Sequence, residues 1–153
     1  MKIRHYTEHL WKRCVAQRQK PMPTRIRLSS IEDRASYPAL KSIVITTNTE
    51  YSGYWLAHEL GHCACHHAAK LNSPTWIRFI YELQAWDWAL TCNPNIPIEA
   101  IACLTGGKAD LLLTYVVDMR ISYKQTGYNL AKQAVTALLE KYNLKWNKAW
   151  DVI

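Results

Sequence analysis

The sequence of 153 residues predicts an α+β fold, in which a small antiparallel sheet near the N-terminus precedes a helical region. Residues 25–28 alternate polar and apolar side chains with a period of two, and residues 42–46 are rich in β-branched side chains. Both patterns are typical of short strands. After about residue 48, apolar residues recur at helical spacing and are interrupted by proline and glycine. Strands followed by helices are typical of the α+β class.

Local signals place the individual elements. A first amphipathic helix is predicted over residues 7–19, and the segment 36–38, which ends in Pro38, is a turn signal between the two strands. Further helices are expected over residues 48–70, 74–93, 98–105 and 109–123, and after Gly127. The predicted apolar face of the terminal helix consists of Leu130, Ala134, Val135, Leu138 and Tyr142.

Length and composition favour one globular domain covering residues 1–153, because a chain of this size can bury a rigid core. No apolar run approaches the roughly 18 residues of a membrane span, and the N-terminus lacks an apolar signal-peptide core, so a cytoplasmic protein is expected. The five cysteines are an odd number without repeated CxxC spacing, which argues against a disulfide framework. The net charge of +7 permits direct nucleic-acid binding without favouring it, because the basic residues are spread along the chain.

The segment His58-Glu59-Leu60-Gly61-His62 fits the HExxH pattern and falls inside a predicted helix. Residues four apart lie on one helical face, so His58 and His62 can converge on one tetrahedral zinc ion. Glu59 lies next to the first ligand and is the candidate general base. A zinc ion lowers the pKa of its bound water toward about 7, and the Glu59 carboxylate can then take the proton of that water. Hydrolysis of a peptide bond is the reaction usually built on this pattern.

Glu82 on the following helix is the candidate third ligand, since a catalytic zinc needs three protein ligands and one open position. Ala85 and Ala89 share the face of Glu82, and small residues there would let two helices approach closely. His66 is the rival third ligand. Three histidines along one straight helix rise by about 6 Å per step, which puts the outer two about 12 Å apart and too far to share an ion.

The sequence resembles the ImmA/IrrE metallopeptidases, a gluzincin family. The resemblance is carried by residues 43–45 leading into 56–62, by His66, and by the segment 82–89 followed by Pro94. It implies a zincin core over about residues 40–94, a helical C-terminal part over about 97–153, and zinc bound by His58, His62 and Glu82. It also implies cleavage of a repressor-type DNA-binding protein and an origin in phage or mobile elements.

The predicted function is therefore that of a zinc-dependent endopeptidase that cleaves a cytoplasmic regulator, such as a helix-turn-helix repressor. One alternative is a zinc-bearing protein that binds a regulator or DNA-associated partner without cutting it. Glu59 argues against that alternative, because a purely structural zinc needs no general base. A further alternative is a SprT-like DNA-associated protease, from which Glu82 distinguishes this chain because that family uses a histidine as third ligand.

Other residues in this region receive structural interpretations. His67 is expected to face solvent, and Cys63 and Cys65 are expected to be buried away from the zinc. Trp76, Trp86 and Trp88 are expected in the core rather than in a substrate groove. The helical pair 98–123, with Arg120 and Lys124 in its second helix, has the outline of a helix-turn-helix, for which packing is the favoured role. The candidates for stabilising the oxyanion are Tyr54, Tyr81, Tyr115 and His66.

Overall fold

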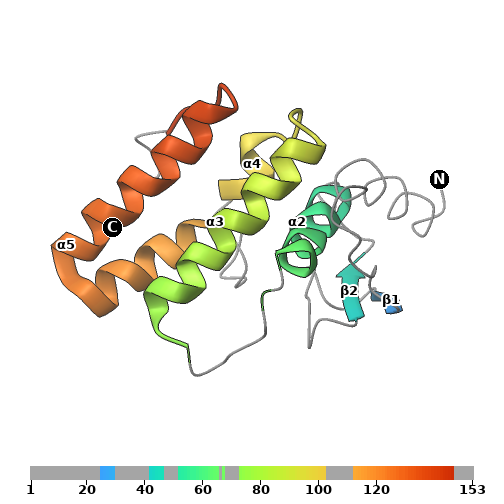
Figure 1. The fold of residues 1–153 in the computed structure, drawn as a ribbon, viewed down its shortest axis with the longest axis horizontal. Helices are drawn as coiled ribbons and strands as arrows, with labels where there is room; N and C mark the ends of the chain where they lie inside the picture. The colour runs from blue at the N-terminus through green and yellow to red at the C-terminus, as the bar shows by residue number, and fades with distance from the viewer. Residues whose placement is uncertain are drawn as a thin grey trace. The chain divides into compact units, whose positions relative to one another are not determined.

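The computed structural model describes residues 25–29, 42–46, 52–65, 67, 73–102 and 112–146, and it describes the first two segments as backbone only. The predicted helix over residues 7–19 lies outside these ranges. The elements are β1 (Arg25–Ser29), β2 (Ser42–Thr46), α2 (Ser52–Ala64), α3 (Thr75–Cys92), α4 (Ile98–Ala102) and α5 (Leu112–Lys141) (Figure 1).

The prediction of an α+β fold with an antiparallel sheet is wrong. Strands β1 and β2 pair in parallel, with Arg25 opposite Ser42 and Ser29 opposite Thr46. Outside this strand pair, helices make up 82% of the described residues, so the described chain is predominantly helical. The segment between the strands, 30–41, has twelve residues. That length suits the crossover of a parallel pair better than a hairpin turn of two to five residues.

Backbone contacts divide the chain into two compact units, one formed by residues 1–71 and 84–96, the other by residues 72–83 and 97–153. The continuous helix α3 belongs to both units: its first half, up to Leu83, lies in the second unit, and its second half, from Gln84, lies in the first. The boundary after Ile96 coincides with the expected start of the helical C-terminal part. The single domain inferred from length stays a prediction.

In the first unit, helix α2 lies beside β2 (Figure 1). Its apolar face and that of the second half of α3 are almost completely buried. The residues concerned are Leu56, Ala57, Leu60, Ala64, Ala85, Trp86, Ala89 and Leu90. The helix ends at Ala64 rather than near residue 70, and its last turn is closed by a bond from the His67 backbone N–H to the His62 carbonyl, 3.0 Å. Such a bond across five residues is typical of a helix C-terminus that reverses the chain.

Helix α3 begins and ends as its sequence signals predict. The backbone N–H groups of Ile77 and Arg78 donate to the carbonyl of Pro74, at 3.0 and 3.2 Å. Proline suits this position because the first N–H groups of a helix have no partner within it. At the other end, the N–H of Asn93 still donates to the carbonyl of Ala89, 2.8 Å, before Pro94 prevents continuation.

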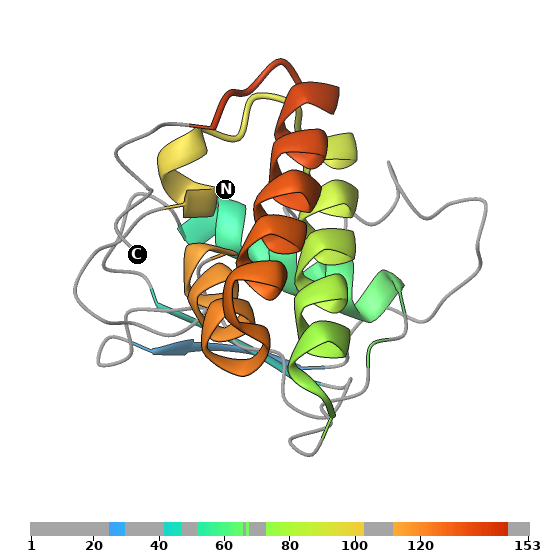
Figure 2. The same cartoon turned by 90° about the vertical axis from the view of Figure 1, so that its left-hand side faces the viewer.

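In the second unit, α5 consists of two helical segments, 112–122 and 125–141, which meet at a sharp bend (Figure 2). The backbone leaves the helical region at Tyr123 and Lys124, and Lys124 has φ 58° and ψ −149°. The break near 123 was predicted, but the predicted apolar face is only partly right, because Val135 is buried whereas Leu130 is 57% exposed. The buried positions of the second segment are Gly127, Ala131, Val135 and Leu139.

The end of the first α5 segment lies against the start of α3, where the hydroxyls of Thr75 and Ser122 are 3.0 Å apart.

Among the described residues, no helix combines the length and the apolar character needed to cross a bilayer.

Candidate metal centre

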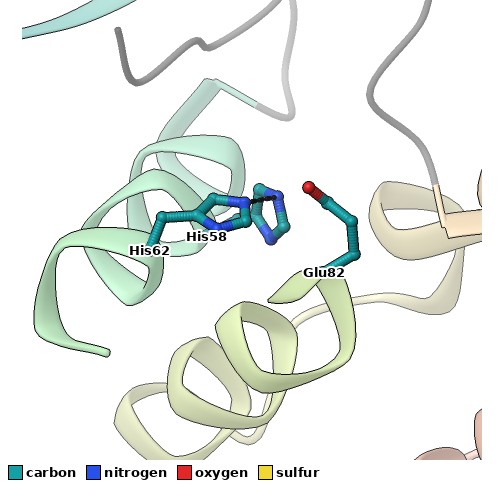
Figure 3. Close-up of side chains that lie close together, drawn as sticks. All are labelled: His58, His62 and Glu82. Carbon is teal, nitrogen blue, oxygen red and sulfur yellow. Dashed lines mark hydrogen bonds between the residues drawn. The ribbon is translucent and has the colours of Figure 1, made fainter. Parts of the chain in front are cut away.

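His58, His62 and Glu82 form a compact group of potential metal ligands, in which one ligand atom from each residue lies within 4.8 Å of the others. His58 and His62 are one turn apart on α2, and Glu82 comes from α3. In Figure 3 the carboxylate of Glu82 points toward the two imidazoles. His58 and Glu82 are buried, with 2% and 7% of their surface exposed, while His62 is partly exposed. The three ligands predicted from spacing therefore lie together.

The two imidazoles are already close to the separation that a shared ion needs. Nε2 of His58 and Nε2 of His62 lie 3.1 Å apart. Two nitrogens bound at about 2.0–2.1 Å to one tetrahedral zinc ion lie about 3.3–3.4 Å apart. The ligand oxygen of Glu82 lies within 4.8 Å of both nitrogens, a gap that its flexible side chain can close. Two nitrogens and one carboxylate oxygen suit zinc better than calcium or magnesium, which prefer oxygen ligands.

A glycine inside the motif allows α2 and α3 to meet. A Cβ at Gly61 would lie 2.9 Å from the Cα of Ala85 and closer still to its carbonyl oxygen. Real side chains do not tolerate such contacts, so the helices can cross at this distance only if position 61 is glycine. Ala85 lies one turn after Glu82, and both it and Ala89 are fully buried. The predicted role of small residues on the Glu82 face is consistent with this crossing.

Trp86 holds the ring of His58 from one side. The two rings are stacked, with centroids 4.3 Å apart and planes 28° apart. Trp86 itself is completely buried, so it forms a fixed wall against the imidazole. Trp86 and Trp88 lie in the core as predicted, but Trp76 is 48% exposed and that part of the prediction is wrong.

The expectation that His67 faces solvent is wrong. Only 5% of its surface is exposed. Its Nδ1 lies 2.8 Å from Nδ1 of His62, and its Nε2 lies 2.7 Å from the amide oxygen of Gln84 on α3. The prediction assumed that α2 continues past residue 67, which would carry this ring about 140° round the helix from His62. Instead α2 ends at Ala64, and the reversed chain returns His67 to the last turn.

The remaining predicted residues take varied positions. Glu59 is buried, with 4% exposed, so it faces the interior although it carries a carboxylate. Tyr54, Tyr81 and Tyr115 are partly exposed on α2, α3 and α5, and a role for any of them in stabilising an oxyanion stays a prediction. His66 lies outside the described residues.

The cysteines depart in part from expectation. Cys63 is buried as predicted, whereas Cys65 is partly exposed, and neither forms a disulfide. Cys92, buried at the end of α3, is disulfide-bonded; the sequence argued against a framework of several disulfides, and that expectation stays a prediction.

The predicted helical pair 98–123 corresponds to α4 and the first segment of α5. Lys124 lies in the bend that ends this segment. The guanidinium of Arg120 lies 5.7 Å from the centre of the Tyr128 ring on the second segment, within range of a cation–π interaction. This contact joins the two segments of α5, and the packing role of the helical pair stays a prediction.

Comparison with known proteins adds no relative to this picture: no family model, no curated protein and no solved structure matches the chain. What the chain itself provides is a buried group of two histidines and one glutamate, held by two crossing helices, that could hold a metal ion. The resemblance to ImmA/IrrE metallopeptidases stays a prediction from sequence.

Proposed function

We propose that the chain is a zinc-dependent endopeptidase, with His58, His62 and Glu82 as zinc ligands and Glu59 as general base. The observation that carries the proposal is the convergence of the two histidines of an HExxH helix with a glutamate from the next helix. Three protein ligands leave a fourth position open, which is the mark of a catalytic rather than a structural zinc site.

The chemistry divides between the ion and the chain. Zinc, when bound, acts as a Lewis acid toward a carbonyl and makes water a competent nucleophile near neutral pH. Glu59 follows His58 on α2 and is buried, so a carboxylate stands next to one of the proposed zinc ligands. Its task is to accept the proton of the attacking water and to pass it to the leaving amine. His58 and His62 contribute neutral ligands, and Glu82 contributes one negative charge.

The proposed substrate is a cytoplasmic regulator, in the first instance a helix-turn-helix repressor, and this choice follows the sequence resemblance. An interdomain linker of such a regulator suits a peptidase, because exposed flexible segments are the preferred sites of cleavage. The alternative, a zinc-bearing protein that captures the regulator without cutting it, would keep binding and lack turnover.

The experiment compares zinc-loaded wild type with Glu59→Gln on a panel of purified helix-turn-helix regulators, with products mapped by mass spectrometry. The amide of the variant can hold water but cannot accept its proton, so we expect cleavage to fall by about 10²-fold or more. Glu140→Gln, which changes an exposed carboxylate on α5, is the matched control and should cleave like wild type. Equal cleavage by Glu59→Gln would contradict the assigned base, and binding without cleavage by wild type would support the alternative.

A further inference from the structure

Gln84, His67 and His62 form a hydrogen-bonded chain that ends at one of the proposed ligands. It runs from the amide oxygen of Gln84 to Nε2 of His67, 2.7 Å, and from Nδ1 of His67 to Nδ1 of His62, 2.8 Å. The other nitrogen of His62, Nε2, is the one that faces His58 across 3.1 Å. The chain therefore ends at the atom that would bind the metal. The rings of His62 and His67 lie nearly edge to face, with centroids 5.1 Å apart.

The chemistry of the first member fixes the direction of every bond in this chain. An amide oxygen only accepts hydrogen bonds, so Nε2 of His67 must carry a hydrogen and donate it to Gln84. A neutral imidazole has one N–H, which leaves Nδ1 of His67 as an acceptor. The hydrogen between the two Nδ1 atoms then belongs to His62, which donates it to His67. Nε2 of His62 is left with a lone pair directed at the ligand group.

We propose that Gln84 and His67 are positioning residues that fix His62 in the tautomer able to bind zinc, an inference that rests on the proposed metal site. If the Gln84 amide presented its NH₂ group instead, each bond in the chain would reverse. Nε2 of His62 would then carry a hydrogen and could not ligate. The orientation of the Gln84 amide thus determines whether Nε2 of His62 carries the lone pair that a metal ion needs.

Two structural features make this chain specific to its positions. His67 reaches His62 only because α2 ends and the chain turns back. The backbone N–H of His67 donates to the carbonyl of His62 at this turn. Gln84 lies two residues after Glu82 on the same helix, so α3 supplies both a ligand and the anchor of the orienting chain. Gln84 is exposed, whereas His67 is buried, so the amide closes the chain at the protein surface.

Substitutions at Gln84 separate acceptor chemistry from mere packing. Gln84→Glu keeps an oxygen that accepts from His67, and Gln84→Met keeps the length of the side chain but removes the acceptor. Partners that orient a metal ligand commonly contribute about 10–100-fold to metal affinity. We therefore expect zinc affinity close to wild type for Gln84→Glu and about 10–100-fold weaker for Gln84→Met. Gln133→Met, at an exposed glutamine on α5, is the matched control and should leave the affinity unchanged.

The decisive readout is the tautomer of His62 in the metal-free protein, measured by nitrogen-15 NMR of histidine-labelled samples, with His62→Asn identifying its signals. The inference predicts hydrogen on Nδ1 and a bare Nε2 in wild type, and loss of this single form in Gln84→Met. Hydrogen on Nε2 of His62 in wild type would overturn it, and so would an unchanged tautomer in Gln84→Met. Because this spectrum needs no metal, it decides the inference even if wild type binds no zinc, a result that would defeat the proposed function instead.

Discussion

The carbonyl and Cα of Ala85 on α3 occupy the space that a side chain at Gly61 on α2 would need, with the Cα only 2.9 Å from the position of a Cβ. This relationship sets the distance between the two helices that carry the proposed ligands. The glycine of the HELGH segment is thus explained by packing, separately from the chemistry of its neighbours.

Gly61→Ala is expected to destabilise the protein although alanine is the better helix former. Overpacking of a closed contact costs about 1–3 kcal/mol, which outweighs the gain of about 1 kcal/mol in helix propensity. Chemical denaturation measures the change in the free energy of unfolding. Ala137→Gly, at an exposed position of α5, calibrates the propensity difference without a packing change. A Gly61→Ala variant as stable as wild type, or more so, would show that the helices do not cross here.

Trp86→Ala and Trp76→Ala form a matched pair on one helix. Removing a fully buried tryptophan costs about 3–5 kcal/mol, and Trp86 is completely buried. Trp76 is 48% exposed, so its replacement should change the free energy of unfolding by no more than about 1 kcal/mol. Trp86→Phe should restore most of the stability and keep an aromatic ring against His58. Similar costs at the two positions, measured by thermal unfolding, would contradict the burial pattern.

Lys124→Gly is expected to stabilise the bend in α5. Lys124 has φ 58° and ψ −149°, a backbone conformation that costs a residue with a side chain about 1–3 kcal/mol and that glycine adopts freely. Glycine also has more conformational entropy than lysine in the unfolded chain, which offsets part of this gain. We therefore expect a net increase of about 1 kcal/mol in the free energy of unfolding.

Asn143→Gly is the control for this substitution. Asn143 also has a positive φ of 60°, but it lies at the C-terminal end of α5. Its backbone N–H donates to the carbonyl of Glu140, and the N–H of Leu144 donates to the carbonyl of Leu139. Asparagine tolerates this position well, so the change should be only a few tenths of a kcal/mol. A destabilised Lys124→Gly variant would indicate that the lysine side chain, rather than the backbone, governs the bend.

The sequence predicted the helices better than it predicted their surroundings. Proline signals placed both ends of α3 because proline acts locally on the chain. Strand direction depends on a distant partner, so the local turn signal near Pro38 led to an antiparallel pair where the structure has a parallel one. The predicted buried face of the second α5 segment was right at Val135 and wrong at Leu130, because the bend at Tyr123 and Lys124 sets the rotation of that segment.

The candidate site divides in the same way. His58 and His62 follow from a spacing that one helix enforces, and Glu82 follows from the length of one helical hairpin. His67 was missed because its position depends on where α2 ends. Gln84 was missed because no sequence pattern around it indicates a contact with His67. The twelve-residue length of the 30–41 segment is a sequence signal that favours a parallel strand pair over a hairpin.

The zinc content of the purified protein tests the central claim most directly. After dialysis against zinc and removal of excess metal, we expect about one zinc ion per chain for wild type, and none retained by His58→Ala, His62→Ala or Glu82→Ala. Glu99→Ala, at an exposed glutamate of α4, and His66→Ala should both keep the ion. Full zinc in Glu82→Ala together with loss of zinc in His66→Ala would contradict the assignment of Glu82 as the third ligand.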